Sequence, residues 1–468
     1  MRKAGITVFL SLIFVLLVSF ISALLSSASL QSEGNKKRLD VDAAVFSIFG
    51  EYQKDMLEYY DIFAVDAAYG GEKFSEQNLV DRMHYYGTDD IDHEITGIEY
   101  LTDYQGAGLR EQVLSYMENL YGLSIITDLT GKSSEWEELE LNGEEAEKED
   151  EKISEQLEEL IGAGETEGET EGETEGETEG ETAEGEESLS VLNEVKNSHL
   201  LTSVLPEEFQ MSDKAVDLSG QVSVRPLNAG RGSFNVRRNL SGKESELLFH
   251  EYILKKFNNA LREDKPVENS TLDYEVEYLI GGKKSDAENL EAVVKKLFRL
   301  RLGINTLFLE TSTQKQSQAG ALALSLCSAA LMPEAEEIVK QIIIGAWAYK
   351  ESRLDVYILL SGGRLPPVKT EENFRTPITG IFGSLVSSEG NPDESGMEYS
   401  DFLRILLYFQ DEDVLTMRAL DRMEENIRLG DHAENFRVDQ AVVKLRMDNK
   451  APIYRGLTYR FPVCFGYR

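Results

Sequence analysis

The feature that most constrains this chain is an apolar segment at its start, which runs from Gly5 to Leu30 without a charged residue. About 20 apolar residues in a helix suffice to cross the hydrocarbon core of a bilayer, and this segment is longer. A second helical pattern follows over residues 39–60, where apolar side chains recur every three or four positions. The sequence therefore predicts a stub and transmembrane helix over residues 1–31 that continues into an amphipathic helix.

The alternative to an anchor is a signal peptide that is removed. Ser26-Ser27-Ala28 offers a small-residue cleavage site, but the apolar regions of signal peptides usually span about 7–15 residues, which favours an uncleaved anchor. Arg2 and Lys3 favour a cytoplasmic N-terminus, whereas the basic residues 36–38 favour the opposite orientation. We expect a single-pass protein of the cell membrane whose large C-terminal body is extracytoplasmic.

Most of the net charge of −38 comes from one acidic segment, because 25 acidic side chains lie between Glu135 and Glu187 against two lysines. The tetrapeptide Glu-Thr-Glu-Gly occurs four times in succession within residues 165–180. Such a segment has too few apolar side chains to offset the entropy of ordering, so we predict a disordered insert over residues 134–187. The negative charge also argues against nucleic acid as a partner, because phosphates require Lys and Arg.

Helical periodicity dominates the remaining sequence and predicts a mostly helical α+β fold. The expected domains are a membrane-proximal helical region over residues 32–133 and an α+β body over residues 188–468. Helices are predicted over residues 109–121, 244–261, 286–309, 318–331, 333–360 and 400–428, with Ser400 as an N-cap. Strands are predicted over residues 272–278 and 436–461, with strands and loops over residues 188–238.

The sequence contains none of four common catalytic motifs: it has no Walker loop, no G-x-G-x-x-G, no H-E-x-x-H and no G-x-S-x-G. The best cluster of metal-ligating types, residues 89–94, lacks a second set of ligands, so we interpret it as an acidic loop that leads into a strand. We predict no catalytic, cofactor-binding or metal-binding residues and a non-enzymatic protein.

Aromatic residues and cysteines offer two further candidates. Tyr52, Tyr59, Tyr60 and Phe63 could form a binding stripe, but their helical spacing favours packing. Cys327 follows an apolar helical run and is expected to be a buried free thiol, and no C-x-x-C pair occurs.

One set of segments is distinctive: residues 5–12, 51–53, 60–66, 272–283, 289–290 and 359–363. Together these segments resemble an uncharacterised family of single-pass membrane proteins from Gram-positive anaerobes. Members of that family, a domain of unknown function, are regarded as pseudopilin-like partners of Tad (Flp) pilus or secretion systems. The resemblance implies processing after Gly5, as in type IV-like prepilins. The sequence departs from the prepilin pattern at Leu10, because prepilins carry a glutamate at that position. This difference favours a minor component that is retained in the membrane.

The resemblance implies a structural role as an assembly component of a Tad-like pilus or secretion system, with the membrane and other membrane proteins of that system as partners. Small residues on the first helix could form a close helix contact, or they could simply face lipid. These residues are Ser19, Ser22, Ala23, Ser26 and Ser27. The alternatives are a cell-surface adhesin or ligand-binding protein and, second, an anchored hydrolase that would need converging carboxylates or Asp92 with His93.

Overall fold

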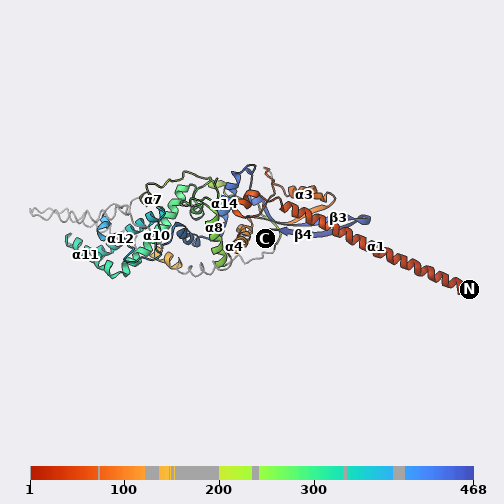
Figure 1. Cartoon of the computed structure of the whole chain (residues 1–468), viewed down its shortest axis with the longest axis horizontal. Coiled ribbons are helices and arrows are strands. Elements are labelled where there is room, and N and C mark those ends of the chain that lie inside the picture. The colour runs from red at the N-terminus through yellow and green to blue at the C-terminus, as the bar shows by residue number, and fades with distance from the viewer. Residues whose placement is uncertain are drawn as a thin grey trace, which may run out of the picture.

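The computed structural model describes residues 2–71, 74–121, 136–146, 148, 152, 200–234, 242–329, 335–382 and 396–467. It confirms a mostly helical α+β fold with one small sheet. The molecule is elongated, with the first helix projecting from one end and helices α11 (Thr313–Ala329) and α12 (Glu336–Leu360) at the other (Figure 1). The repeat over residues 165–180 lies outside the described residues, and the domain boundaries stay predictions.

Helix α1 (Arg2–Phe49) is one unbroken helix of 48 residues. Every side chain from Ile6 to Leu25 is exposed. In the second half Val41, Ala44, Val45 and Ile48 form a buried stripe at helical spacing. The predicted helix over residues 39–60 is wrong in one respect, because it breaks after Phe49 and restarts as α2.

Helix α2 (Lys54–Tyr60) begins at a cap of its own. The side-chain oxygen of Gln53 accepts hydrogen bonds from the backbone N–H groups of Asp55 and Met56, as an N-cap does. The apolar periodicity of residues 39–60 does not reveal this cap. Met56 and Tyr60 are buried like the stripe of α1, so the apolar pattern continues across the break. The chain therefore turns away from the long helix before the aromatic residues that follow.

The sheet packs against the second half of α1 and holds four antiparallel strands. They are β1 (Val65–Asp66), β2 (Asp92–Tyr100), β3 (Ala441–Ile453) and β4 (Leu457–Gly466). The long strand β3 pairs with each of the other three. The prediction of strands in the C-terminal tail is confirmed. Because β3 and β4 come from that tail, the two ends of the chain share one hydrophobic cluster around Val45, Ile98 and Met447.

The central helices surround a second and larger hydrophobic cluster. These helices are α4 (Asp103–Tyr121), α8 (Lys243–Lys256), α9 (Glu275–Gly281), α10 (Asp286–Thr311), α13 (Tyr399–Tyr408) and α14 (Glu412–Arg428). Three shorter elements are also helical: α3 (Gln77–Met83) and the π-helical turn η1 (His84–Thr88) lie between β1 and β2, and α7 (Leu200–Val204) precedes α8. A third cluster, around Trp347, joins α10, α11 and α12 at the distal end. Cys327 is buried in this cluster as predicted, and Cys464 is exposed.

Three local predictions are wrong. Residues 272–278 form no strand, because their alternating carboxylates turn inward on α9, which ends where Gly282 adopts φ +63°. Residues 400–428 form two helices, since Asp411 caps the second by accepting a hydrogen bond from the N–H of Val414. The N-cap of the first is Glu398, and Ser400 lies inside the helix. The described part of residues 188–238 contains α7, loops and isolated bridges.

Candidate functional site

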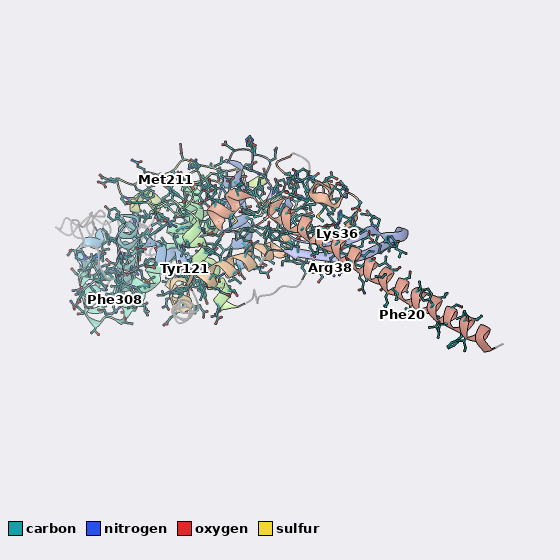
Figure 2. All side chains as sticks on the ribbon, turned by 45° about the vertical axis from the view of Figure 1, so that its right-hand side comes forward. Phe20, Lys36, Arg38, Tyr121, Met211 and Phe308 are labelled. Carbon is teal, nitrogen blue, oxygen red and sulfur yellow. The ribbon has the colours of Figure 1, made fainter. Side chains whose placement is uncertain are left out.

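The projecting half of α1 is the first candidate surface. Ser19, Ser22, Ala23 and Ser27 are exposed on it, and Ser26 is half-buried. Figure 2 shows Phe20 on the part of the helix that extends beyond the body. This helix is long and apolar enough to cross a membrane, and none of its most apolar stretch is buried, although an N-terminal signal sequence has the same properties. Gly5 lies inside the helix.

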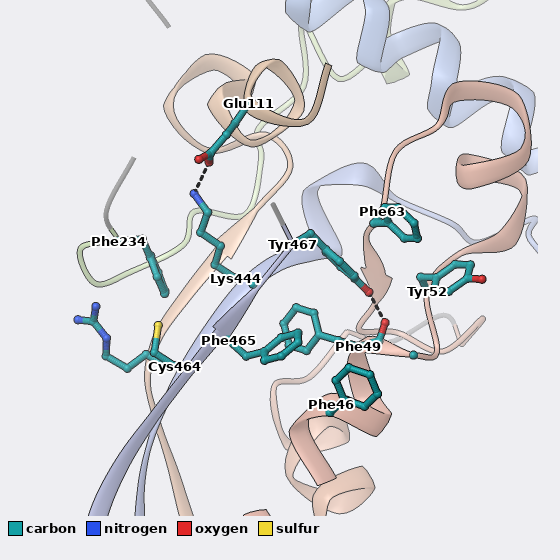
Figure 3. A pocket seen from close by; sticks show the side chains of 13 residues that line it. Phe46, Phe49, Tyr52, Phe63, Glu111, Phe234, Lys444, Cys464, Phe465 and Tyr467 are labelled. Carbon is teal, nitrogen blue, oxygen red and sulfur yellow. Dashed lines mark hydrogen bonds and ion pairs between the residues drawn. The ribbon is translucent and has the colours of Figure 1, made fainter. Parts of the chain in front are cut away.

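The second candidate is an aromatic groove where α1 meets the end of β4 (Figure 3). Its volume is about 670 Å³, within the range of small-molecule and peptide pockets. Phe46 and Phe49 from the last turn of α1 form one wall, and Phe465 and Tyr467 from the end of the chain form another. We call this site the aromatic groove.

Ring contacts hold the aromatic walls of the groove in place. The ring centroids of Phe49 lie 4.8 Å from Phe465 and 5.0 Å from Tyr467, and Phe63 stacks on Tyr467 at 5.4 Å. The Tyr467 hydroxyl donates a hydrogen bond of 2.5 Å to the carbonyl oxygen of Phe49. Phe46 differs from these residues, because it is 66 % exposed and its ring lies edge-on to Phe465 with the centroids 6.1 Å apart. An occupant would therefore meet Phe46 first.

Two basic side chains of β3 stand on the other side of the groove. The Lys444 ammonium lies 2.8 Å from a Glu111 carboxylate oxygen and 3.0 Å from one of Glu99. Burial alone would lower the pKa of Lys444, but the hydrogen bonds to these carboxylates outweigh burial and raise it. The guanidinium of Arg446 lies over the ring of Phe234 at 5.2 Å. The groove thus offers a mainly aromatic surface with a charged rim, which suits apolar side chains of a protein segment.

The sequence indicated part of this groove. Tyr52 and Phe63 line it, whereas Tyr60 is buried in the central core and Tyr59 packs partly buried against that core. Sequence reasoning missed the contribution of the C-terminus. The alternation of Phe461, Val463, Phe465 and Tyr467 could have revealed it, because alternate residues of a strand share one face.

The acidic segment at residues 89–94 does lead into a strand, as predicted, since Asp89 and Asp90 are exposed and β2 begins at Asp92. His93 is not solvated. Its ring nitrogens lie 2.6 Å from Asn449 Oδ1 and 2.8 Å from Thr88 Oγ1, and burial lowers the pKa of the imidazole. Within the described ranges, no group of three His, Cys, Asp or Glu side chains converges as metal ligands would.

Two carboxylates with perturbed pKa values lie on α9. Burial raises the pKa of Glu275 and of Glu277 to about 7 each. Glu275 accepts hydrogen bonds from the backbone N–H of Asn258 and from Asn426, and Glu277 accepts them from the N–H of Ala260 and from the Tyr399 hydroxyl. Neither glutamate has any exposed surface. A substrate cannot reach them in this conformation, so their observed role is to hold the segment after α8.

These glutamates predict a pH dependence of stability. The carboxyl groups bind protons more tightly in the folded state than in the unfolded chain, where a glutamate has a pKa near 4.5. Each glutamate therefore contributes stability that is present below pH 4.5 and is lost as pH rises to about 7. The expected loss is roughly 1.4 kcal/mol per pH unit and per glutamate. Chemical unfolding of the full chain and of Glu277→Gln between pH 4.5 and 8 measures it. The free energy of unfolding of the variant should rise relative to that of the wild type as pH increases. A difference in this free energy that stays constant with pH would contradict the prediction.

A family of unknown function (DUF5702) matches residues 178–453, more than half of the chain. The matched region includes α7 to β3 and excludes α1, β1, β2 and β4. No curated protein and no solved structure matches the chain. The projecting helix and most of the aromatic groove therefore lie outside the matched region.

Proposed function

This chain belongs to the DUF5702 family, whose function is unknown, and from that premise we propose that it is a non-enzymatic, membrane-anchored assembly component. In this proposal α1 crosses the cell membrane and packs beside transmembrane helices of partner proteins. The body is extracytoplasmic, and the aromatic groove receives an apolar segment of a partner. The system would be a Tad (Flp)-like pilus or secretion apparatus, as the resemblance of the sequence implies.

One observation carries the proposal: the apolar segment and the core-packing stripe belong to the same continuous helix. The exposed residues from Ile6 to Leu25 and the buried stripe from Val41 to Ile48 are joined without a break. A loosely attached signal sequence needs no such rigid link to the fold. A helix that both anchors the body and positions it is the layout of pilin-like proteins, which supports the resemblance.

Two surfaces support contact with other proteins. The small side chains around Ser22 would let a second helix approach closely, since small residues favour helix packing in lipid. The groove exposes Phe46, and aromatic side chains in partly formed pockets dominate binding energy at many interfaces. Leu10 stands where prepilins carry a glutamate, so the proposed role is that of a minor component retained in the membrane rather than a filament subunit.

A ligand-binding or adhesin role is the second candidate, and the groove favours it. A volume of about 670 Å³ lined by aromatic rings could hold a small apolar ligand as well as a peptide. The buried position of Glu275 and Glu277 gives no comparable support to an anchored hydrolase. The occupant of the groove therefore distinguishes the two leading candidates.

Site-specific photocrosslinking tests the assembly role. Benzoylphenylalanine is placed at Ser22 or at Phe46 in the full chain, in cells of the organism that encodes it. We expect adducts at Ser22 with a protein that has an apolar N-terminal helix and belongs to a pilus or secretion apparatus, identified by mass spectrometry. We expect an adduct at Phe46 with a component of the same apparatus.

Matched positions serve as controls. Ile21 lies roughly opposite the small residues on α1, and Leu324 is 53 % exposed on α11 at the distal end. Equal adducts at Ser22 and Ile21 would contradict a specific helix contact. If the probe at Phe46 captured no protein while the groove bound a small ligand, the result would favour the ligand-binding role.

A further inference from the structure

The hairpin of β3 and β4 extends beyond the rest of the sheet. Strand β2 begins at Asp92, which pairs with Lys450, so residues 451–459 form a two-stranded projection with no third strand. Figure 1 shows the tip of this hairpin beside α1, directed toward the N-terminal end of the helix. Within this projection Ala451 lies in the hydrophobic cluster of the sheet and Tyr459 packs against it, while the turn η6 (Tyr454–Gly456) forms the tip.

Two contacts fix the position of the tip along α1. The N–H of Tyr454 donates a hydrogen bond of 2.7 Å to the carboxylate of Glu33. The ring of Tyr459 lies 3.5 Å from the position that a Cβ on Gly34 would take. Gly34 is buried under this ring. Glu33 comes three residues after Leu30, where the apolar run ends, so about 5 Å of helix separates the tip from that run.

Two exposed side chains at the tip are aromatic or aliphatic. Tyr454 is 50 % exposed and Leu457 is 51 % exposed. Hairpin turns more often carry small polar residues such as Asn-Gly. Lys36 and Arg38 are exposed on α1 at the same end of the body (Figure 2). Tyrosine is enriched at membrane–water interfaces, and Lys and Arg extend their charges toward phosphate while their stems lie on apolar surface.

We propose that the tip of the β3–β4 hairpin is a second contact with the membrane, seated in the phospholipid headgroup layer of the bilayer that α1 crosses. This inference rests on the anchoring role of α1 proposed above. Tyr454 and Leu457 enter the interface. Lys36 and Arg38, which lie on the neighbouring helix α1, bind lipid phosphates. Acidic side chains at the same end of the body have basic partners, since Lys37 pairs with Asp90, and Lys450 pairs with Asp92 and Glu94.

The contact has a mechanical consequence. A single transmembrane helix leaves a body free to tilt about its point of exit from the lipid. A second contact beside the helix restrains that tilt, and the hairpin is bonded to α1 through Glu33. The aromatic groove, at the other end of the same sheet, is then held at a defined height above the membrane.

Spin-label accessibility tests the proposal on the full chain in liposomes of phosphatidylcholine and phosphatidylglycerol. The Cys464→Ser background leaves the buried Cys327 as the remaining cysteine. Nitroxides are attached in separate proteins at Leu457→Cys and Thr458→Cys on the tip, at Leu16→Cys in the apolar run and at Leu324→Cys on the distal helix. Collision with oxygen reports lipid, and collision with a water-soluble nickel chelate reports water.

We expect the ratio of oxygen to nickel collisions at Leu457 to exceed that at Leu324 severalfold and to fall below that at Leu16. Thr458 provides an independent reading if the label at Leu457 disturbs the turn. A label at Leu16 in lipid with both tip labels in water would overturn the hairpin contact and leave the anchor intact. Tip labels hidden from both reagents would indicate a protein contact instead. A label at Leu16 in water would overturn the anchor and the hairpin contact together.

Discussion

Replacing Asp355 with asparagine should destabilise the distal helices by about 3–5 kcal/mol, because it leaves the buried Arg301 without its carboxylate partner and leaves Lys369 with Glu351 alone. One Asp355 oxygen accepts a hydrogen bond of 2.9 Å from Arg301 Nε, and the other accepts one of 2.8 Å from Lys369. All three side chains have no exposed surface. Burial alone would raise the pKa of Asp355, but the two cations outweigh burial and hold it below the usual value.

The cluster joins three segments, which explains the size of the expected effect. Arg301 lies on α10, Asp355 on α12 and Lys369 on the segment after α12. Urea unfolding followed by tryptophan fluorescence measures the change in a Trp136→Phe background, where Trp347, buried in the distal cluster, is the remaining tryptophan. Glu291→Gln on α10 is the matched control, because its partner Lys295 is exposed and the pair should contribute less than about 0.5 kcal/mol. Equal midpoints for the two variants would refute the prediction.

The second large effect concerns retention in the membrane. Phe14→Arg combined with Leu17→Arg should remove most of the chain from the membrane fraction, because each arginine costs about 2.5–3.5 kcal/mol at the centre of a spanning helix. Both side chains are exposed on the projecting half of α1, at 67 % and 52 %, so the body should fold as before. Fractionation of cells and N-terminal sequencing of each pool measure the outcome.

Leu39→Arg is the control for this variant. Leu39 is 67 % exposed on the same helix but lies beyond the apolar run, so its substitution should leave partition unchanged. A wild-type chain that already begins near Ser29 and is found in the medium would contradict the anchor. A chain that begins after Gly5 and stays in the membrane would instead indicate prepilin-type processing despite Leu10.

Long periodic segments were the most predictable parts of this fold. The helix over residues 286–309 was expected from Leu290, Val293, Val294 and Leu297, and α10 covers it. The strands of the C-terminal tail were expected from alternation, and β3 and β4 confirm them. These elements present one apolar face to one core, so the period alone identifies them.

Local periodicity failed where tertiary contacts override it. Residues 272–278 alternate as a strand would, but Glu275 and Glu277 are buried with distant backbone partners, which no local pattern can indicate. For a related reason the sequence predicts only part of the aromatic groove, namely Tyr52 and Phe63, and not its C-terminal wall. Phe49 and Phe465 are more than 400 residues apart in the sequence, and their contact depends on the tail returning to α1.

Because α1 is unbroken, it also fixes the angle around the helix axis between its small-residue face and the groove wall. A helix turns by about 100° per residue, so Phe46 lies roughly 140° around the helix axis from Ala23. The small-residue face on the projecting half of α1 and the groove wall on its last turn therefore face different directions. A single straight partner helix cannot follow both. An assembly that uses both surfaces would place this chain between two neighbours, and inserting or deleting one residue between Leu30 and Val41 would change the angle between them.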